Sequence, residues 1–210
     1  APVTKEAVRH GPRVEAVDGR LVISCRTHNS GMGAVSAAQH LVVANSEVQR
    51  TCRAAPDDVA AEYAIEATPG STLRLDKFAA YHASAEVSLA DLAEQVERTL
   101  QVAASEGFDS LLAGQRQCLD KFWERSDVRI EGDAAIQQAV RWNLFQLAQA
   151  TLRADGQGVP AKGLTGRGYD GHYFWDTEIY LLPFLIQTYP HIARDLLRFR
   201  YGMLDAARRK

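Results

Sequence analysis

The hydrophobic period of this sequence changes near residue 87, and no other feature constrains the fold more. Before that point apolar and polar residues alternate, which is typical of strands that bury one face. The alternating segments are 21–25, 59–68 and 72–84. Asp18-Gly19 and Pro69-Gly70 precede two of these segments and are typical turn dipeptides. This part of the chain therefore predicts antiparallel strands that form part of a β-sandwich.

After residue 87 the apolar residues recur at intervals of three and four residues, which is typical of helices. Ser88 and Asp91 fit a capping box, so a helix is expected to begin there, and Gly107 predicts its end. Further helices are expected to begin at Phe108, after Asp133, near Trp175 and after Pro190. The helix after Asp133 carries an apolar stripe formed by Ile136, Val140, Leu144 and Leu147. Strands first and helices second indicate two architectural units rather than an alternating βαβ sheet.

Composition argues against several classes of protein. The 210 residues carry a formal net charge of −2, which gives no electrostatic reason to expect nucleic acid as a partner. No apolar run approaches the ~18–20 residues that span a bilayer, and the N-terminal residues lack the apolar core of a signal peptide. We therefore expect a cytoplasmic protein without a membrane partner. The cysteines lack metal-ligand spacing, so reduced, mostly buried thiols and no metal site are expected at Cys25, Cys52 and Cys118.

The segment from Gly163 to Glu178 is rich in glycines, aromatic residues and carboxylates. Gly166 to Gly171 matches the G-x-G-x-x-G pattern of dinucleotide-binding folds, which requires a strand before it and a helix opening from it. The residues ahead of Gly166 form a poor strand, and bulky aromatic side chains follow Gly171. This context argues against a nucleotide site.

The same segment suits a carbohydrate better. Aromatic rings cover the apolar C–H faces of a sugar, and an ionised carboxylate accepts short, strong hydrogen bonds from neighbouring hydroxyl groups. A structural alternative makes Phe174 and Trp175 core residues where a helix begins, with Asp176 or Thr177 as its N-cap. Composition alone leaves both interpretations open. The candidate sugar-binding residues are Tyr169, His172, Phe174, Trp175 and Asp176.

Two stretches of this region form a recognisable signature. They are Pro160-Ala-Lys-Gly-Leu-Thr-Gly166 and Gly168-Tyr-Asp-Gly-His-Tyr-Phe-Trp-Asp-Thr-Glu178, of which Phe-Trp-Asp-Thr-Glu is the most specific element. They closely resemble glycoside hydrolase family 65, the inverting disaccharide phosphorylases that act on maltose, trehalose, kojibiose, nigerose and related α-glucosides. The likeness covers most of the chain from about residue 60 and includes Phe122-Trp123, 141–145 and 193–201.

The resemblance implies a multidomain protein in which β structure precedes α structure. Residues 1–87 would form the later part of an N-terminal β-sandwich, 88–130 a helical linker, and 131–210 the first helices of an incomplete (α/α)6 catalytic barrel. It also implies that Trp175 and Asp176 line the subsite for the transferred glucose. Its further implications are an α-linked glucose disaccharide as substrate, inorganic phosphate as co-substrate with no cofactor, the remainder of the same polypeptide as a partner, and a homodimer.

Catalysis by inversion needs a carboxylic acid that protonates the leaving oxygen and a nucleophile on the opposite face of the sugar ring. By resemblance, phosphate is that nucleophile and β-glucose 1-phosphate is the product. Asp176 and Glu178 are two residues apart, so they cannot face each other on a helix. The resemblance puts the acid, a glutamate, beyond Lys210. No catalytic residue is therefore expected in this chain, and Glu178 is expected to be structural.

The chain begins without Met and ends at Lys210 without a helix stop signal, so we expect a piece of a longer polypeptide. Phosphorylase activity is not expected from these residues alone. Two alternatives stay open. A non-catalytic carbohydrate-binding module would keep Trp175 and Asp176 but need no acid, and a hydrolase of the same family would use water in place of phosphate.

Overall fold

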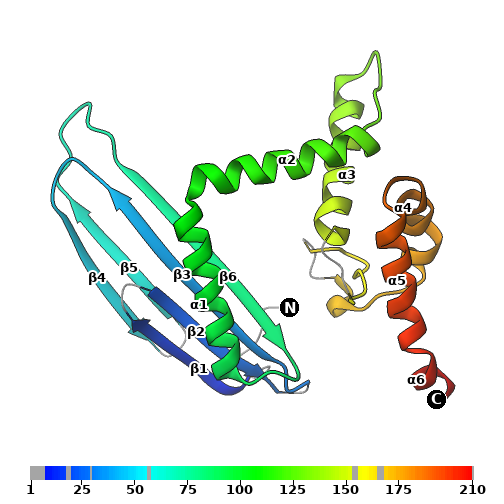
Figure 1. Cartoon of the computed structure of the whole chain (residues 1–210), viewed down its shortest axis with the longest axis horizontal. Coiled ribbons are helices and arrows are strands. Elements are labelled where there is room, and N and C mark those ends of the chain that lie inside the picture. The colour runs from blue at the N-terminus through cyan, green and yellow to red at the C-terminus, as the bar shows by residue number, and fades with distance from the viewer. Residues whose placement is uncertain are drawn as a thin grey trace. The chain divides into compact units, whose positions relative to one another are not determined.

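The computed structural model describes residues 8–17, 20–28, 30–55, 58–152, 156–164 and 168–209. The Asp18-Gly19 turn and part of the Gly166–Gly171 pattern therefore lie outside the described residues. The residues form two compact units, within which they contact one another closely in space. These are Ala1–Gly114 (unit one) and Gln115–Lys210 (unit two). Figure 1 shows the elements of each unit.

Unit one contains two antiparallel sheets. The larger has the order β1-β2-β3-β6 and is formed by β1 (Val8–Val17), β2 (Arg20–Thr27), β3 (Gly33–Val43) and β6 (Arg74–Ser84). The smaller is formed by β4 (Val48–Ala55) and β5 (Asp58–Ile65). The sheets contact each other where β1 and β2 meet β4 and β5. Each segment predicted from alternation is a strand, and the predicted turn at Gly70 is present with a φ of +86°.

Helix α1 (Leu89–Glu106) covers one face of the larger sheet, as Figure 1 shows. Alternate residues of β3 and β6 point to this face because successive side chains of a strand lie on opposite sides. Leucine and valine side chains from α1 complete the core, since they recur at helical spacing. The buried residues of this core are Val35, Ala37, Phe78, Ala80, Leu92, Val96 and Leu100.

Both ends of α1 lie where the sequence predicts them. The Ser88 hydroxyl oxygen accepts from the Asp91 amide at 3.1 Å, and the same hydroxyl donates to the Asp91 carboxylate at 2.7 Å. Gly107 ends the helix with a φ of +78°, a backbone conformation that glycine adopts without steric cost. The predicted helix start at Ser88 is confirmed, although the Asp91 carboxylate bonds to the Ser88 hydroxyl rather than to the backbone amide that a capping box uses.

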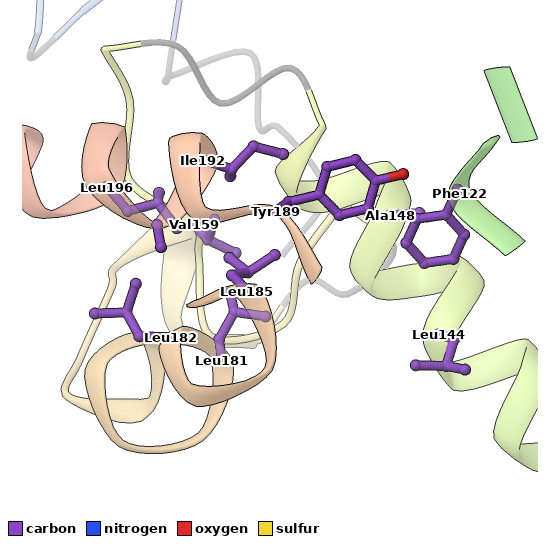
Figure 2. Packing of buried hydrophobic residues seen from close by; sticks show 11 residues of the cluster. Phe122, Leu144, Ala148, Val159, Leu181, Leu182, Leu185, Tyr189, Ile192 and Leu196 are labelled. Atoms are coloured by element: carbon purple, nitrogen blue, oxygen red, sulfur yellow. The ribbon is translucent and has the colours of Figure 1, made fainter. Parts of the chain in front are cut away.

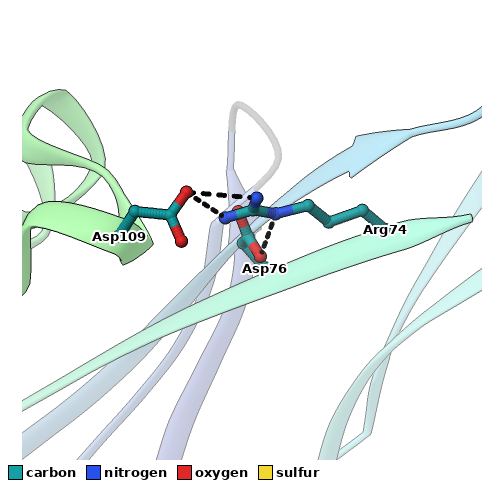
Figure 3. Close-up of polar contacts among 3 residues, drawn as sticks. All are labelled: Arg74, Asp76 and Asp109. Atoms are coloured by element: carbon teal, nitrogen blue, oxygen red, sulfur yellow. Dashed lines mark hydrogen bonds and ion pairs between the residues drawn. The ribbon is translucent and has the colours of Figure 1, made fainter. Parts of the chain in front are cut away.

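An arginine on β6 joins that strand to the first turn of α2 (Phe108–Ser126) (Figure 3). The Arg74 Nε donates to both Asp76 oxygens at 3.0 Å, and its two terminal nitrogens donate to Asp109 at 3.2 Å. The guanidinium also lies 5.8 Å from the ring centre of Phe108. These hydrogen bonds raise the pKa of Arg74 above its ordinary value. The contacts orient the start of α2 against the sheet.

Unit two is helical. It contains the second half of α2, α3 (Ala134–Thr151), η2 (Gly168–Gly171), η3 (Thr177–Leu181), α4 (Leu182–Thr188), α5 (Pro190–Gly202) and α6 (Leu204–Arg208). Asp133 caps α3 as predicted, because its carboxylate accepts from the amides of Ala135 and Ile136 at 2.9 and 3.1 Å. The helix expected near Trp175 begins as a π-helical turn at Thr177, and α5 begins at Pro190 as predicted.

One apolar core holds unit two together (Figure 2). It joins the end of α2, the middle of α3, the π-helical turn, α4 and the first half of α5. Its largest buried members are Phe122, Leu144, Leu181, Leu182, Leu185, Tyr189, Ile192 and Leu196. Of the predicted stripe on α3, Leu144 is buried, but Ile136 is 51% exposed because it lies in the first turn, before the helix reaches this core.

The prediction of mostly buried cysteines is wrong. Cys52 and Cys118 are exposed and Cys25 is half-buried. Cys52 lies on β4, whose residues are largely exposed because, among the described residues, β5 alone pairs with β4 in the smaller sheet. Among the described residues, no helix is both long enough and apolar enough to cross a membrane.

Candidate functional site

The short helix η2 arranges three of the five predicted sugar-binding residues. Tyr169 has a φ of +62°, which is uncommon for a residue with a side chain. Its carbonyl accepts from the amide of His172 at 2.8 Å and from the Nδ1 of the same residue at 2.9 Å. The Tyr169 ring packs edge-on against Phe174, with ring centres 5.4 Å apart. Tyr169 and Phe174 are 61% and 45% exposed, so both rings are accessible in this chain.

Asp176 lines a hollow of about 410 Å³ in unit two. One wall comes from α3, a second from residues 159–164, and a third from the π-helical turn that begins beside Asp176. Lys162 and Tyr180 also line it, and they add a cation and a phenol to the carboxylate. A volume in this range fits a small ligand such as a sugar. The hollow thus combines apolar walls with a few polar groups.

The structural alternative for the Phe174–Thr177 segment is not supported. Asp176 stands at the N-cap position of the π-helical turn but makes no side-chain capping bond. Trp175 is 69% exposed and Phe174 is also exposed, so neither belongs to the core. Only Thr177 is buried, and its hydroxyl lies 3.5 Å from the carbonyl of Val159. In this chain Asp176 therefore lines the hollow and does not cap the helix end with its side chain.

An arginine from α5 contacts several residues of the stretch Gly168–Glu178, which we call the signature segment. Arg200 donates from Nε to one oxygen of Glu178 at 2.6 Å and from Nη2 to the other oxygen at 3.0 Å. Nη2 also donates to the backbone carbonyl of Phe174 at 2.5 Å. The guanidinium lies over the rings of Tyr173 and Trp175, at 5.2 and 5.6 Å from their centres. The hydrogen bond with Glu178 raises the pKa of Arg200. Glu178 is thus engaged in an ion pair with Arg200, and its structural role stays a prediction.

The structure distributes the predicted residues over two places. Asp176 lines the hollow, whereas Tyr169, His172, Phe174 and Trp175 are not among its lining residues. The five predicted sugar-binding residues did not include Lys162 or Tyr180, although Tyr180 belongs to the aromatic residues of the same segment. Tyr180 could have been found, because it follows Asp176 by four residues and so shares its helical face. Lys162 lies in an irregular segment, where spacing carries no such signal. Among the described residues, no group of three or more His, Cys, Asp or Glu side chains is placed to hold a metal ion.

Comparisons with known proteins agree with this architecture. Residues 2–122 match the model of the glycosyl hydrolase family 65 N-terminal domain, and residues 141–210 match that of the family 65 central catalytic domain. The fold is similar to a solved structure of a candidate kojibiose phosphorylase from the human microbiome, with a TM-score of 0.80 over 93% of this chain and 26% of that one, at 23% sequence identity.

Curated relatives show the same likeness in sequence. An uncharacterized glycosyl hydrolase of Mycobacterium tuberculosis is 40% identical over 98% of this chain and 26% of its own length. An α,α-trehalose phosphorylase of Thermoanaerobacter brockii is 37% identical over 93% of this chain and 25% of its own length. The chain thus spans about a quarter of the length of these relatives. With its β-rich first part followed by helices, the chain belongs to glycosyl hydrolase family 65.

Proposed function

We propose that this chain is part of an inverting α-glucoside phosphorylase and that it supplies residues of the donor-glucose subsite. Trp175 offers an exposed ring for the apolar face of the sugar, and Asp176 offers a carboxylate for its hydroxyl groups. The observation that carries the proposal is the position of Asp176 in the wall of the hollow beside Lys162 and Tyr180.

The reaction we propose uses inorganic phosphate in place of water. Phosphate attacks the anomeric carbon of an α-linked glucose disaccharide from the face opposite the leaving oxygen, and a carboxylic acid protonates that oxygen. The products are β-glucose 1-phosphate and the second sugar. The trehalose phosphorylase among the relatives supports a disaccharide and phosphate as substrates.

The general acid is proposed to be a glutamate outside these residues. Both carboxylate oxygens of Glu178 are occupied by hydrogen bonds from Arg200, so neither is free to face the leaving oxygen. We also propose that 1–87 belongs to a β-sandwich, 88–130 to a helical linker and 131–210 to the start of an (α/α)6 barrel. Phosphate, the remainder of the polypeptide and a second copy of the chain are proposed as partners.

The test is a product assay on the full-length protein with an α-linked glucose disaccharide such as trehalose, with and without phosphate. Phosphate-dependent release of β-glucose 1-phosphate, identified by its anomeric NMR signal, supports the proposal. Release of free glucose without phosphate indicates a hydrolase of the family and overturns phosphorolysis. Binding of the sugar without any turnover indicates a carbohydrate-binding module and also overturns it.

A further inference from the structure

Arg200 makes contacts on both sides of the Trp175–Asp176 dipeptide. On the N-terminal side it donates to the carbonyl of Phe174, and on the C-terminal side it donates to both oxygens of Glu178. Its guanidinium lies 5.6 Å from the centre of the Trp175 ring. One side chain from α5, 22 residues away from Glu178, therefore contacts the backbone before the dipeptide, the Trp175 ring and the carboxylate of Glu178 after it.

The surroundings of this pair make the arrangement rigid. The side chains of Arg200 and Glu178 are only 26% and 16% exposed, so solvent competes weakly for their hydrogen bonds. The neighbouring residue of α5, Phe199, packs edge-on against Tyr173 with ring centres 5.1 Å apart. The phenol of Tyr173 lies 3.4 Å from the sulfur of Met203. Two residues of α5, Phe199 and Arg200, and Met203 just beyond its end thus contact the segment ahead of the dipeptide.

The chemistry of arginine explains why this residue suits the role. Its planar guanidinium carries five N–H donors in a fixed fork, so it can bind a carboxylate with two parallel bonds and still donate elsewhere. It also stacks on aromatic faces. Lysine would keep the charge but could not reach Glu178, the Phe174 carbonyl and the Trp175 ring at the same time.

We propose that Arg200, held by Glu178, is a positioning residue that orients the Trp175 ring and the Asp176 carboxylate for the donor glucose. The proposal rests on the proposed function of Trp175 and Asp176. An exposed tryptophan that rotates freely must lose that freedom when a sugar binds, whereas a ring that is already held does not. Arg200 therefore acts on sugar affinity without touching the sugar.

The test uses the full-length protein and the substitution Arg200→Lys, with Arg198→Lys as the matched control. Arg198 lies two residues earlier on α5, is 69% exposed and pairs only with the nearby Asp195 at 3.5 Å in the described structure. In Arg200→Lys we expect the KM for the disaccharide to rise about tenfold, in the range of one lost cation–π contact, while the KM for phosphate changes less than about twofold. Arg198→Lys should leave both constants unchanged.

Fluorescence quenching reports how accessible the Trp175 ring is. If Arg200 only stabilised the fold, its substitution would leave this accessibility unchanged in the folded protein. The fluorescence of Trp175 is obtained by subtracting the spectrum of a Trp175→Phe variant from that of the same protein with Trp175. Quenching of this difference signal by acrylamide is then compared between the folded unsubstituted protein and folded Arg200→Lys. Arg200→Lys should make Trp175 more accessible to the quencher. An unchanged disaccharide KM and unchanged quenching, with a lower melting temperature, would show that Arg200 only stabilises the fold and would overturn the proposal.

The positioning proposal and the proposed function fail in different ways. If Trp175→Ala and Asp176→Asn weaken disaccharide binding but Arg200→Lys does not, the dipeptide binds sugar and only the positioning role is refuted. If all three variants bind the disaccharide as the unsubstituted protein does, the proposed subsite itself is refuted, and with it the role of Arg200.

Discussion

The phenol ring of Tyr189 stacks on the ring of Phe122, with centres 6.0 Å apart and planes inclined by 16°. Both rings are buried, and the Tyr189 hydroxyl donates to the carbonyl of Lys121 at 3.2 Å. Figure 2 shows the Tyr189 ring next to the Phe122 ring of α2, in similar orientations. This contact ties the end of α2 to the junction of α4 and α5.

Stacking should contribute more to stability than the hydrogen bond. Phe122→Ala removes a fully buried ring and is expected to lower the free energy of unfolding by about 3–5 kcal/mol. Tyr189→Phe keeps the ring but loses the hydrogen bond, and is expected to cost only about 1 kcal/mol. Urea unfolding followed by circular dichroism measures both. Equal losses in the two variants would contradict the larger contribution of the packing.

A pair of glycine substitutions tests the packing beside the signature segment. A Cβ atom on Gly158 would lie 2.6 Å from a ring carbon of Phe199 and 3.1 Å from one of Tyr173. Gly158→Ala should therefore force these rings apart and destabilise the protein by about 1–3 kcal/mol.

Gly114 offers the matched control. It lies within α2, and a Cβ atom there would have no neighbour within 4 Å. Gly114→Ala should stabilise the protein by about 0.5–1 kcal/mol, since alanine favours helix. Thermal unfolding compares the two substitutions. If Gly158→Ala were as stable as Gly114→Ala, the close packing of Phe199 on Gly158 would be wrong.

The ion pair between Asp127 and Arg141 predicts a pH dependence. Arg141 donates from Nε to Asp127 at 2.9 Å and makes a second bond from Nη2, and these bonds lower the pKa of Asp127 from 3.8. Because the folded-state pKa is lower, the stabilisation is present above about pH 4 and is lost as pH falls through that folded-state pKa.

Unfolding measured between pH 2 and pH 7 tests this effect. The stability difference between the unsubstituted protein and Asp127→Asn should be constant above about pH 5 and shrink at lower pH. Asp120→Asn, at an exposed position on α2, is the control and should change stability little at any pH. A difference that grows as pH falls would contradict the assigned ion pair.

Assay of the isolated 210 residues tests where the acid lies. We predict that this chain forms no glucose 1-phosphate from a disaccharide and phosphate, because its Glu178 is engaged by Arg200 and the proposed acid is absent. Correct folding of the sample is verified first by its cooperative thermal transition. Robust phosphate-dependent turnover by this chain alone would show that the general acid lies within it.

Local patterns in the sequence predicted the elements better than the contacts between them. The capping residues Ser88 and Asp133 marked two helix starts, because an N-cap bond forms with amides only two or three residues away. The exposure of Cys52 could not be predicted, because it depends on how few strands its sheet contains. Residue spacing also gives no signal for the bond between Glu178 and Arg200, which depends on how α5 packs in three dimensions.

The sequence predicted some residues of the candidate site but not how they are brought together. The signature segment indicated Trp175 and Asp176 through residue type and family resemblance. Which side chains share the hollow with Asp176 depends on the path of residues 159–164 and on the position of α3. Lys162 therefore emerged only from the structure. The family and the β-then-α order were predicted correctly from the sequence, and the domain boundaries at 87 and 130 stay predictions.

The most direct test of the account compares phosphorolysis by the unsubstituted full-length protein with that by Asp176→Asn. The carboxylate and the amide have nearly the same shape, so the substitution changes the charge and hydrogen-bonding capacity offered to the sugar while keeping the walls of the hollow. We predict formation of the β anomer of glucose 1-phosphate by the unsubstituted protein and a loss of kcat/KM of about a hundredfold or more in Asp176→Asn. Formation of the α anomer, or full activity in Asp176→Asn, would contradict the account.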